Sequence, residues 1–390
     1  MHEALEGSQA LARAVALCRP QVVAAYPITP QTHIVENLAK LVADGHLDAE
    51  LVSVESEFSA ASVALGAALA GSRAYTASAS QGILLMAEVL YDIAGMRVPL
   101  VLTCANRAVS APLNIWNDQQ DSMAVRDAGW IQLYCADNQE AVDTTIQAFR
   151  IAERTELPVM VCVDGFTLTH TLEPLDIPSA AAVDAFLPPF AFSRALDPRA
   201  PASHGTLVDA TYYPEARHSQ HHALLKAASE IVAADVDWAA ATGRSCGGLV
   251  EIEDAPDARI GVLALGSVYG TLADARALAP HLPPVRLIRL RCFRPFPAGA
   301  LRDACGGLTD LVVLERALCP GSGGIIANEI RAAFYAWPDM PRVHGFAAGL
   351  GGRDVPLGLF AQLVAAADAA EPTDFSIVDV DLSKLPTEDR

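Results

Sequence analysis

The chain has 390 residues, of which 52% are hydrophobic and 19% charged, and its 46 acidic and 27 basic residues give a net charge of −19. This length exceeds that of a single hydrophobic core, so we expect at least two domains. Binding to nucleic acid requires clustered lysine and arginine to neutralise phosphates, and the acidic balance argues against such a partner. No apolar run approaches the roughly 18 residues that span a membrane, so we expect no membrane segment.

The eight cysteines occur singly, with no Cys-x-x-Cys pair and no histidine at zinc-ligand spacing. We therefore expect no metal site and no iron–sulfur cluster on this chain. Several cysteines lie within apolar runs, where a reduced thiol behaves as a small hydrophobic side chain. Reduced thiols and the absence of a secretory pattern predict a cytoplasmic location.

Short apolar runs alternate with segments of helical period over the first 165 residues, which predicts βα units and a doubly wound parallel sheet. In such sheets ligands bind beyond the carboxyl ends of the strands. We place this first domain at residues 1–170. The expected strands are 21–26, 51–54, 73–78, 98–105, 130–136 and 158–163, and the expected helices are 31–45, 57–71, 80–95 and 138–154.

The pattern weakens between residues 171 and 257, where prolines recur and one helix is expected near 219–236. This segment is too long for an ordinary loop, so we interpret it as a connector arm that lies on its own domains or on a neighbour. His218, His221 and His222 fit the polar start of a helix better than a metal site.

The alternation resumes at Arg259 and predicts a second, smaller α/β domain over residues 258–372, followed by a tail over residues 373–390. Its glycine-rich segments, 265–267 and 320–324, match neither the complete P-loop nor the complete Rossmann spacing. We interpret them as tight turns and not as phosphate sites. The expected strands are 259–266, 285–290, 310–315 and 342–346, and the expected helices are 270–279, 297–305, 323–336 and 357–369.

Four polar segments directly follow strands of the first domain, and they should meet at one edge of the sheet. Taken singly, each has an ordinary explanation as a turn, a helix cap or a surface ion pair. Their shared position makes them candidates for one site. The segments are Tyr26-Pro27-Ile28-Thr29-Pro30, Glu55-Ser56-Glu57, Ala79-Ser80-Gln81-Gly82 and Asn106-Arg107.

These segments belong to an ordered set of motifs that resembles the alpha subunit of the pyruvate:ferredoxin (2-oxoacid:acceptor) oxidoreductase family. The resemblance covers nearly the whole chain and implies a pyrimidine-type thiamine diphosphate domain followed by a transketolase-C-terminal-like domain. Besides the four segments, the matching motifs are Leu113-Asn114-Ile115-Trp116-Asn117-Asp118-Gln119-Gln120-Asp121, Asp164-Gly165-Phe166, Phe293-Arg294-Pro295-Phe296-Pro297 and Gly349-Leu350-Gly351-Gly352-Arg353-Asp354.

The resemblance assigns three residues to the coenzyme. Glu57 would hydrogen-bond the aminopyrimidine ring of thiamine diphosphate and so promote removal of the thiazolium C2 proton. Glu57 is preferred over Glu55 because it lies where the helix begins and matches the motif. Pro27 and Ile28 would form part of the wall around the coenzyme.

Three further residues are assigned to the substrate. Arg107 would hold the carboxylate of a 2-oxo acid, since its planar guanidinium offers two parallel hydrogen bonds. Thr29 would donate its hydroxyl to the same carboxylate or to the adjacent carbonyl oxygen. Ile115 would line the pocket beside the substrate's side chain.

The chain has no Gly-Asp-Gly followed by an Asn-rich segment, which is the usual site for magnesium and the diphosphate. The resemblance implies that a beta subunit supplies this half together with an iron–sulfur cluster. A gamma subunit and a ferredoxin-like subunit would complete the complex, and coenzyme A would accept the acyl group.

Three alternatives stay open at this point. Pyruvate is the first expectation for the substrate, but Arg107 and Thr29 would recognise any 2-oxo carboxylate, including that of a branched, indolic or aryl acid such as phenylglyoxylate. A thiamine enzyme of the transketolase type, which passes no electrons, is a second possibility. A Rossmann-type binding protein is the third, and the incomplete glycine motif argues against it.

Overall fold

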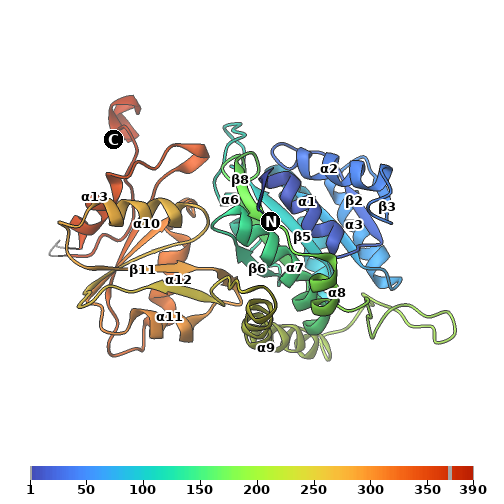
Figure 1. Ribbon diagram of the computed structural model, residues 1–390. Coiled ribbons are helices and arrows are strands. Elements are labelled where there is room, and N and C mark those ends of the chain that lie inside the picture. Colours follow the sequence, from blue (N-terminus) through green and yellow to red (C-terminus); the bar gives the residue numbers. More distant parts are fainter. Residues whose placement is uncertain (1, 368–370, 390) are drawn as a thin grey trace.

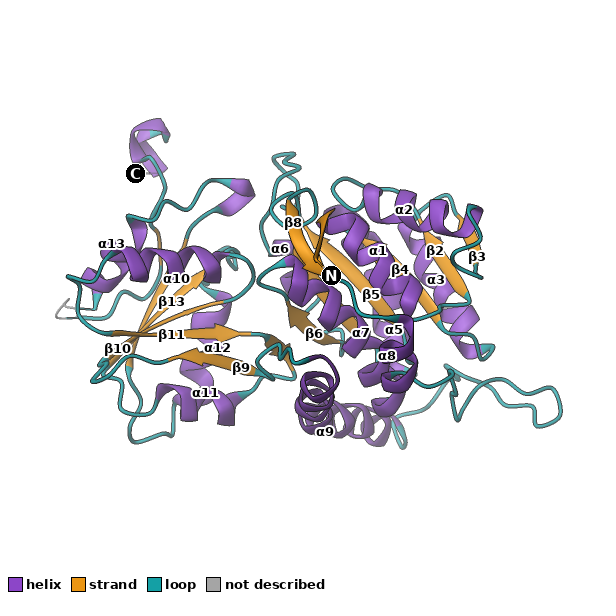
Figure 2. Cartoon of the chain, in the orientation of Figure 1, coloured by secondary structure: helices purple, strands orange, loops and turns teal. Residues whose placement is uncertain are grey.

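The computed structural model describes residues 2–367 and 371–389, which form two α/β units lying side by side (Figure 1). Each unit contains a mainly parallel sheet with helices packed against it (Figure 2). The predicted α/β class with parallel sheets is therefore confirmed. No helix in the described part of the chain is both long and apolar enough to cross a bilayer.

The first unit is built on a sheet with helices on both faces. Its strands are β2 (Val22–Ala25), β3 (Glu50–Ser53), β4 (Ala74–Ser78), β5 (Val101–Asn106), β6 (Ile131–Tyr134), β7 (Val159–Asp164) and β12 (Cys292–Arg294). The helices are α1 (Gly7–Leu17), α2 (Thr32–Ala43), α3 (Glu57–Leu69), α4 (Ser80–Leu85), α5 (Ala87–Gly95), α6 (Gln120–Ala124) and α7 (Asn138–Thr155).

The strand order in this sheet is β12-β6-β7-β5-β4-β2-β3, and the neighbours pair in parallel except β12 with β6. Strands β4, β5 and β7 are buried along their whole length, which explains their continuous apolar sequences. The register places Asn106 at the end of β5 opposite Asp164 at the end of β7. We call this side of the sheet, where β2, β4, β5 and β7 end, the carboxyl edge.

The predicted strands and helices of the first unit are present with small shifts at their ends, except that the predicted helix 80–95 is divided at Met86 into α4 and α5. The sequence analysis missed the amino-terminal strand β1 (His2–Glu6) and α1. Strand β1 pairs antiparallel with β8 (Leu172–Asp176), so its partner is more than 160 residues away in the chain. A strand that is defined by such a distant partner gives no local pattern in the sequence.

The connector is more regular than its proline-rich sequence indicates. Beyond β8 it contains α8 (Ala180–Phe186) and α9 (Tyr213–Thr242). Helix α9 is longer than the predicted helix 219–236 and carries Pro214 in its first turn, where proline is tolerated. Trp238 of α9 is fully buried and packs edge-on against Phe186 at 4.9 Å between ring centroids. Arg150 and Arg154 of α7 form ion pairs with Asp237 and Glu230 of α9, so this part of the arm lies on its own first unit. The domain boundaries themselves remain a prediction.

The second unit contains a sheet with the strand order β15-β14-β13-β10-β11-β9, in which β9 alone among the described strands pairs antiparallel. The strands are β9 (Val250–Glu253), β10 (Ile260–Ala264), β11 (Val285–Leu290), β13 (Asp310–Glu315), β14 (Arg342–Ala347) and β15 (Ser376–Ile377). The helices are α10 (Val268–Leu278), α11 (Ala298–Cys305), α12 (Ile325–Phe334) and α13 (Leu359–Ala366), with short 3-10 turns η1 (Leu350–Gly352), η2 (Leu382–Lys384) and η3 (Thr387–Asp389).

The four predicted strands of this unit are present, and β15 lies in the segment predicted as a tail. The predicted helix 357–369 corresponds to α13, and its residues 368 and 369 lie outside the described residues.

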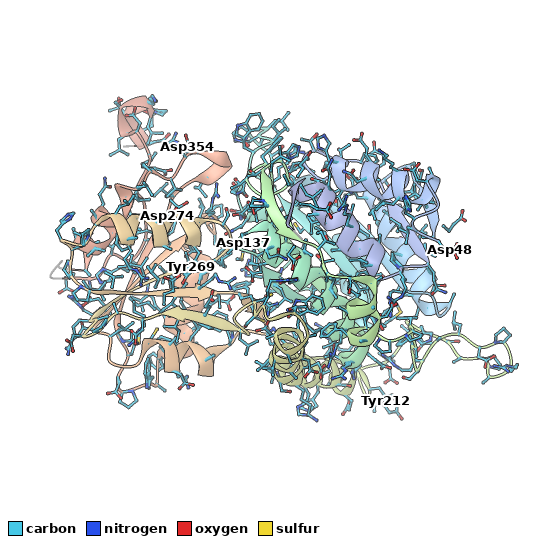
Figure 3. The ribbon with its side chains drawn as sticks, viewed as in Figure 1. Asp48, Asp137, Tyr212, Tyr269, Asp274 and Asp354 are labelled. Atoms are coloured by element: carbon cyan, nitrogen blue, oxygen red, sulfur yellow. The ribbon has the colours of Figure 1, made fainter. Side chains whose placement is uncertain are left out.

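The two units are joined by a strand and by buried charges. Strand β12 comes from the second part of the chain but adds to the edge of the first sheet, and Phe293 packs edge-on against Tyr134 at 6.4 Å. Arg289 of β11 bridges Glu140 of α7 at 2.5 Å and Glu251 of β9 at 2.7 Å. Asp137 and Tyr269, labelled in Figure 3, line one cavity between the units.

The glycine-rich turn 320–324 is a structural turn, as the sequence analysis proposed. The amide groups that begin α12 are taken by the chain's own Glu315, whose carboxylate accepts hydrogen bonds from Ile325, Ile326 and Ala327 at 2.8, 2.9 and 3.1 Å. Burial raises the pKa of Glu315 to about 7. A phosphate group would have to displace this carboxylate.

Candidate functional site

The carboxyl edge is organised by the buried carboxylate of Asp121. Its Oδ2 accepts hydrogen bonds from the backbone amides of Ser80 at 2.8 Å and Arg107 at 3.0 Å. Its Oδ1 accepts from Asn106 Nδ2 and from the Ser122 amide, each at 2.8 Å. Burial raises the pKa of Asp121, and these hydrogen bonds act in the opposite direction. One side chain thus fixes the ends of β4 and β5 relative to each other.

Glu57 is the first residue of α3 and is 7% exposed. Ser56 caps this helix, since its hydroxyl accepts a hydrogen bond from the Ser59 amide at 3.2 Å. The Glu57 carboxylate has no hydrogen bond or ion pair with any other described residue. Glu55, in contrast, is exposed and bonded by the Ser59 hydroxyl, which lowers its pKa.

Gly82, in α4, packs closely against the Glu57 side chain. A side chain at this position would place its Cβ 2.7 Å from Glu57 Oε1 and 2.3 Å from Ser78 Oγ, which is closer than such atoms approach. The ends of β3 and β4 therefore meet at Glu57, as predicted from the strand order.

Arg107 follows β5 and is also 7% exposed. Its Nη1 donates to the carbonyl oxygen of Thr29 at 2.9 Å, and its Nε donates to the carbonyl oxygen of Asn114 at 3.1 Å. Burial lowers the pKa of Arg107. Both bonds use neutral acceptors, and no carboxylate within the described residues pairs with this guanidinium. The nitrogen Nη2 is left for a further acceptor.

The loop that contains Pro27, Ile28 and Thr29 lies between β2 and α2 and is anchored by a buried glutamine. Gln31 Nε2 donates to the carbonyl oxygen of Ala77 on β4 at 3.0 Å, and Gln31 Oε1 accepts from the Ile28 amide at 3.2 Å. Pro27 and Thr29 are exposed at this edge, and Ile28 is half-buried. The loop is therefore held beside Arg107 with its Thr29 hydroxyl accessible.

Ile115 lies in the loop 113–121, which is pressed against the second unit. Asn114 Nδ2 donates to the Gly351 carbonyl at 3.0 Å, and the Asp118 carboxylate accepts from the Gly351 amide at 3.2 Å. Any side chain at Gly352 would collide with Trp116, since its Cβ would be 2.3 Å from Trp116 Cβ. Burial raises the pKa of Asp118 to about 6. Ile115 is half-buried, next to the residue whose carbonyl binds Arg107.

Asp164, at the end of β7, connects the second unit to the same edge. Its Oδ2 accepts hydrogen bonds from the amide of Ser267 at 2.9 Å and from its hydroxyl at 2.5 Å, and Oδ1 accepts from Gln119 Nε2 at 3.2 Å. Gly266 adopts φ +72°, and a Cβ there would lie 2.5 Å from Gln119 Nε2. The turn 265–267 therefore binds a carboxylate of the chain itself.

The structure brings together all six residues that the sequence analysis singled out: Glu57, Pro27, Ile28, Thr29, Arg107 and Ile115 lie along one edge of the first sheet. The analysis missed the residues that hold this edge in place, namely Asp121, Gln31, Asp118 and Asp164. Three of these lie inside motifs already quoted, but sequence gives no sign that their carboxylates point inward.

Large apolar side chains are exposed around the same edge. Phe58 follows Glu57, Leu84 and Leu85 end α4, and Trp116 and Leu113 lie on the loop beside Arg107; their exposed fractions range from 37% to 75%. Exposed apolar groups of this size, gathered at one edge, are typical of a surface that another protein covers.

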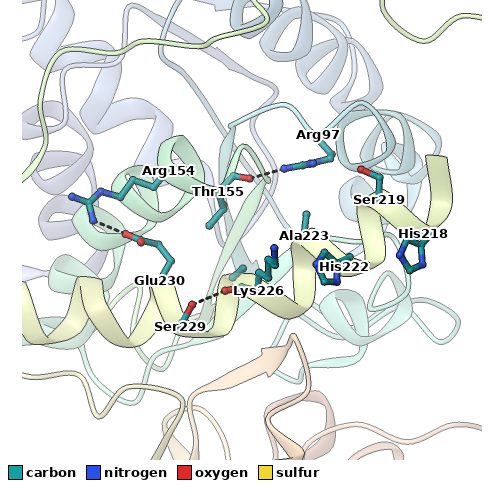
Figure 4. A pocket seen from close by; sticks show the side chains of 11 residues that line it. Arg97, Arg154, Thr155, His218, Ser219, His222, Ala223, Lys226, Ser229 and Glu230 are labelled. Carbon is teal, nitrogen blue, oxygen red and sulfur yellow. Dashed lines mark hydrogen bonds and ion pairs between the residues drawn. The ribbon is translucent and has the colours of Figure 1, made fainter. Parts of the chain in front are cut away.

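A different cavity, of about 580 Å³, lies between α9 and the residues that precede β5 and β7 (Figure 4). It is lined by Arg97, Arg154 and Lys226, with His218 and His222 stacked at 5.9 Å on the exposed side of α9. Strands β5 and β7 begin beside this cavity. It therefore lies at the opposite edge of the sheet from Glu57 and Arg107, which lie where the strands end.

Comparisons with known proteins identify the family of the chain. The family model described as pyruvate flavodoxin/ferredoxin oxidoreductase, thiamine diP-binding, matches residues 13–235, and the model of pyruvate:ferredoxin oxidoreductase core domain II matches residues 258–358. A solved 2-oxoglutarate:ferredoxin oxidoreductase from Magnetococcus marinus has the same fold, with a TM-score of 0.72 and 18% identity over 94% of this chain. The chain spans 65% of the length of that protein's chain.

Curated relatives are similar over most of their length. The pyruvate synthase subunit PorA of Methanothermobacter thermautotrophicus is 46% identical over 90% of this chain and 91% of its own. The alpha subunit of NADH-dependent phenylglyoxylate dehydrogenase from Aromatoleum evansii is 41% identical over 80% of this chain and 78% of its own. On the family match and these identities, the chain belongs to the pyruvate flavodoxin/ferredoxin oxidoreductase family.

Proposed function

We propose that the chain is the alpha subunit of a thiamine diphosphate-dependent 2-oxoacid:acceptor oxidoreductase. The enzyme would convert a 2-oxo acid and coenzyme A to acyl-CoA and CO2, and pyruvate is the expected 2-oxo acid. The observation that carries this proposal is the pair of buried charged groups at the carboxyl edge, Glu57 and Arg107, neither of which has an ionic partner among the described residues. Burying unpaired charges is costly, so both groups are expected to meet a ligand.

Thiamine diphosphate, when bound, supplies a carbon nucleophile for the 2-oxo group and accepts the electron pair released with CO2. The residues present fit its aminopyrimidine ring, because the Glu57 carboxylate is buried, has no hydrogen bond with another described residue and can share a proton with a ring nitrogen. Pro27 and Ile28, at the neighbouring loop, would form the wall. Glu57 would act as the proton donor and acceptor of this half-site.

Arg107 and Thr29 would hold the substrate. The guanidinium of Arg107 is fixed in the plane set by its bonds to the Thr29 and Asn114 carbonyls, and Nη2 can then donate to a carboxylate. The Thr29 hydroxyl lies on the same loop and would donate to the carboxylate or to the 2-oxo oxygen. Ile115 would contact the substrate's side chain and so influence which 2-oxo acid binds.

The half-site would be completed by other chains. The sequence has no Gly-Asp-Gly segment with a following Asn-rich stretch, and apolar side chains surround the edge where the diphosphate half would dock. Relatives of this chain carry names that mark them as subunits. We expect a beta subunit with magnesium, the diphosphate site and a cluster, together with a gamma subunit and a ferredoxin-like subunit. The eight free thiols favour a cytoplasmic complex.

Relatives of this chain are named for different 2-oxo acids, namely pyruvate, phenylglyoxylate and ketoisovalerate, so the substrate is tested separately from the class. We expect the purified complex to show its highest kcat/KM with pyruvate and to require coenzyme A. Reduction of the acceptor would be measured with pyruvate, 2-oxoisovalerate and phenylglyoxylate, each with and without coenzyme A. A preference for phenylglyoxylate would change the substrate but keep the class, whereas no electron transfer with any of these acids would contradict the proposed class.

Replacing Glu57 by Gln should abolish most turnover without preventing assembly, because the amide cannot share a proton with the pyrimidine ring. We expect exchange of the C2 proton of bound thiamine diphosphate to slow by about 10²-fold or more, the usual scale for general acid–base catalysis. Glu55→Gln is the matched control, since Glu55 is two residues away and exposed. Exchange at the wild-type rate in Glu57→Gln would make Glu57 a structural residue.

Replacing Arg107 should weaken use of the substrate while leaving coenzyme activation intact. Loss of a hydrogen bond to a charged group costs about 1.5–3 kcal/mol, so Arg107→Lys should lose about one to two decades of kcat/KM and Arg107→Met more. C2 proton exchange should remain at the wild-type rate in both. Arg97→Met is the control. Arg97 also donates to a backbone carbonyl, that of Thr155, but it lies at the edge of the sheet where the strands begin. Unchanged kinetics in Arg107→Met would remove Arg107 from the site.

A further inference from the structure

Three side chains that can bind a metal meet beside the carboxyl edge. Glu6 ends β1, His33 lies in the first turn of α2, and His170 lies in the turn after β7. Each offers a ligand atom within 4.8 Å of the ligand atoms of the other two, and no other such group of three occurs within residues 2–367 and 371–389. All three are partly exposed, so an ion could enter from solvent.

The geometry of the two imidazoles suits a shared ion. His33 Nδ1 lies 2.7 Å from Glu6 Oε1, and the ring centroids of His33 and His170 are 4.6 Å apart. His170 Nδ1 is bonded to the hydroxyl of buried Thr169 at 2.8 Å, so its Nε2 is the nitrogen left for a ligand. A hydrogen bond to the second ring nitrogen is the usual way in which proteins orient a metal-binding histidine.

The charges of the cluster also favour an ion. Two imidazoles face a single carboxylate, so a proton shared by Glu6 and His33 leaves His170 without an anionic partner in the cluster. A neutral imidazole is the form that binds metals.

We propose that Glu6, His33 and His170 bind one divalent transition-metal ion, with zinc as the best match to two imidazole nitrogens and one carboxylate oxygen. Further coordination positions of the ion would stay open to water. Its ligands come from residues 6, 33 and 170, which explains why the spacing of the sequence predicted no metal site.

The bound ion would stabilise the segments that carry the proposed substrate residues. His33 follows Pro30 by three residues, and Pro30 packs against Gly165, whose Cβ would lie 2.5 Å from Pro30 Cγ. The Phe166 ring lies 4.7 Å from His170 and 5.1 Å from Trp116 between centroids. The ion would therefore link β1, α2 and the turn after β7, next to the loop that holds Thr29.

Zinc binding to the untagged full-length chain tests this proposal. After removal of metals with EDTA, ZnCl2 would be titrated by calorimetry, and zinc retained after gel filtration would be counted by mass spectrometry. We expect one zinc per wild-type chain and a rise in melting temperature on binding, and loss of both effects in His33→Gln and His170→Gln. Circular dichroism of the metal-free variants would establish that they are folded.

His222→Gln is the matched control, because His218 and His222 form the chain's stacked histidine pair on α9. This variant should bind zinc as the wild type does. Wild-type stoichiometry and melting in folded His33→Gln and His170→Gln would overturn the proposal, as would loss of zinc in His222→Gln alone. Failure of the wild type to retain zinc would also overturn it. Because thiamine diphosphate is absent from this experiment, its result is independent of the proposed catalytic function.

Discussion

One buried carboxylate, that of Asp121, determines where the candidate site residues lie. It accepts the backbone amides that follow β4 and β5 together with the side chain of Asn106. Parallel strands end at a common edge but need not present their next residues in a fixed relation. Asp121 fixes that relation. The segment after β4, which contains Gly82 and packs against Glu57, is thereby held in a fixed position relative to Arg107, which follows β5. Separate residues thereby form one continuous site.

The second unit supports the same edge from the other side. Asp118 and Asn114 reach the turn at Gly351, and Asp164 reaches Ser267, so the loop that carries Ile115 is held between the units. The contact is close enough that a side chain at Gly352 would meet Trp116. The motif 349–354 in the second unit thus supports the loop that carries Ile115, on the proposed substrate side of the candidate site.

The sheet and its functional edge could be predicted because both depend on local patterns. The apolar runs of β4, β5 and β7 indicate buried parallel strands, and the polar residues that follow them, including Glu57 and Arg107, are then placed at one edge by the rules of the fold. The choice of Glu57 over Glu55 came from the family resemblance and agrees with their burial, although its catalytic role stays a prediction.

What could not be predicted depends on residues far apart in the chain. Strand β1 is defined by its partner β8, and β12 by a neighbour in the other unit, so neither has a recognisable sequence period. The inward direction of the Asp121 carboxylate depends on donors at the start of α4 and at the end of β5. The cluster of Glu6, His33 and His170 is likewise formed by folding and has no spacing that a motif could describe.

The replacement Asp121→Asn tests most directly whether this carboxylate assembles one site from two functional halves. The amide keeps the shape but presents an N–H group to donors that need an acceptor, so at least two of the hydrogen bonds to this side chain are lost. A displacement of about 1 Å can cost 10²-fold in rate. We predict that C2 proton exchange and kcat/KM for the 2-oxo acid both fall in the folded Asp121→Asn complex. The Arg107 variants, in contrast, should lower kcat/KM and leave C2 proton exchange at the wild-type rate, and Glu57→Gln should slow the exchange itself. Wild-type values of both quantities in Asp121→Asn would contradict the account.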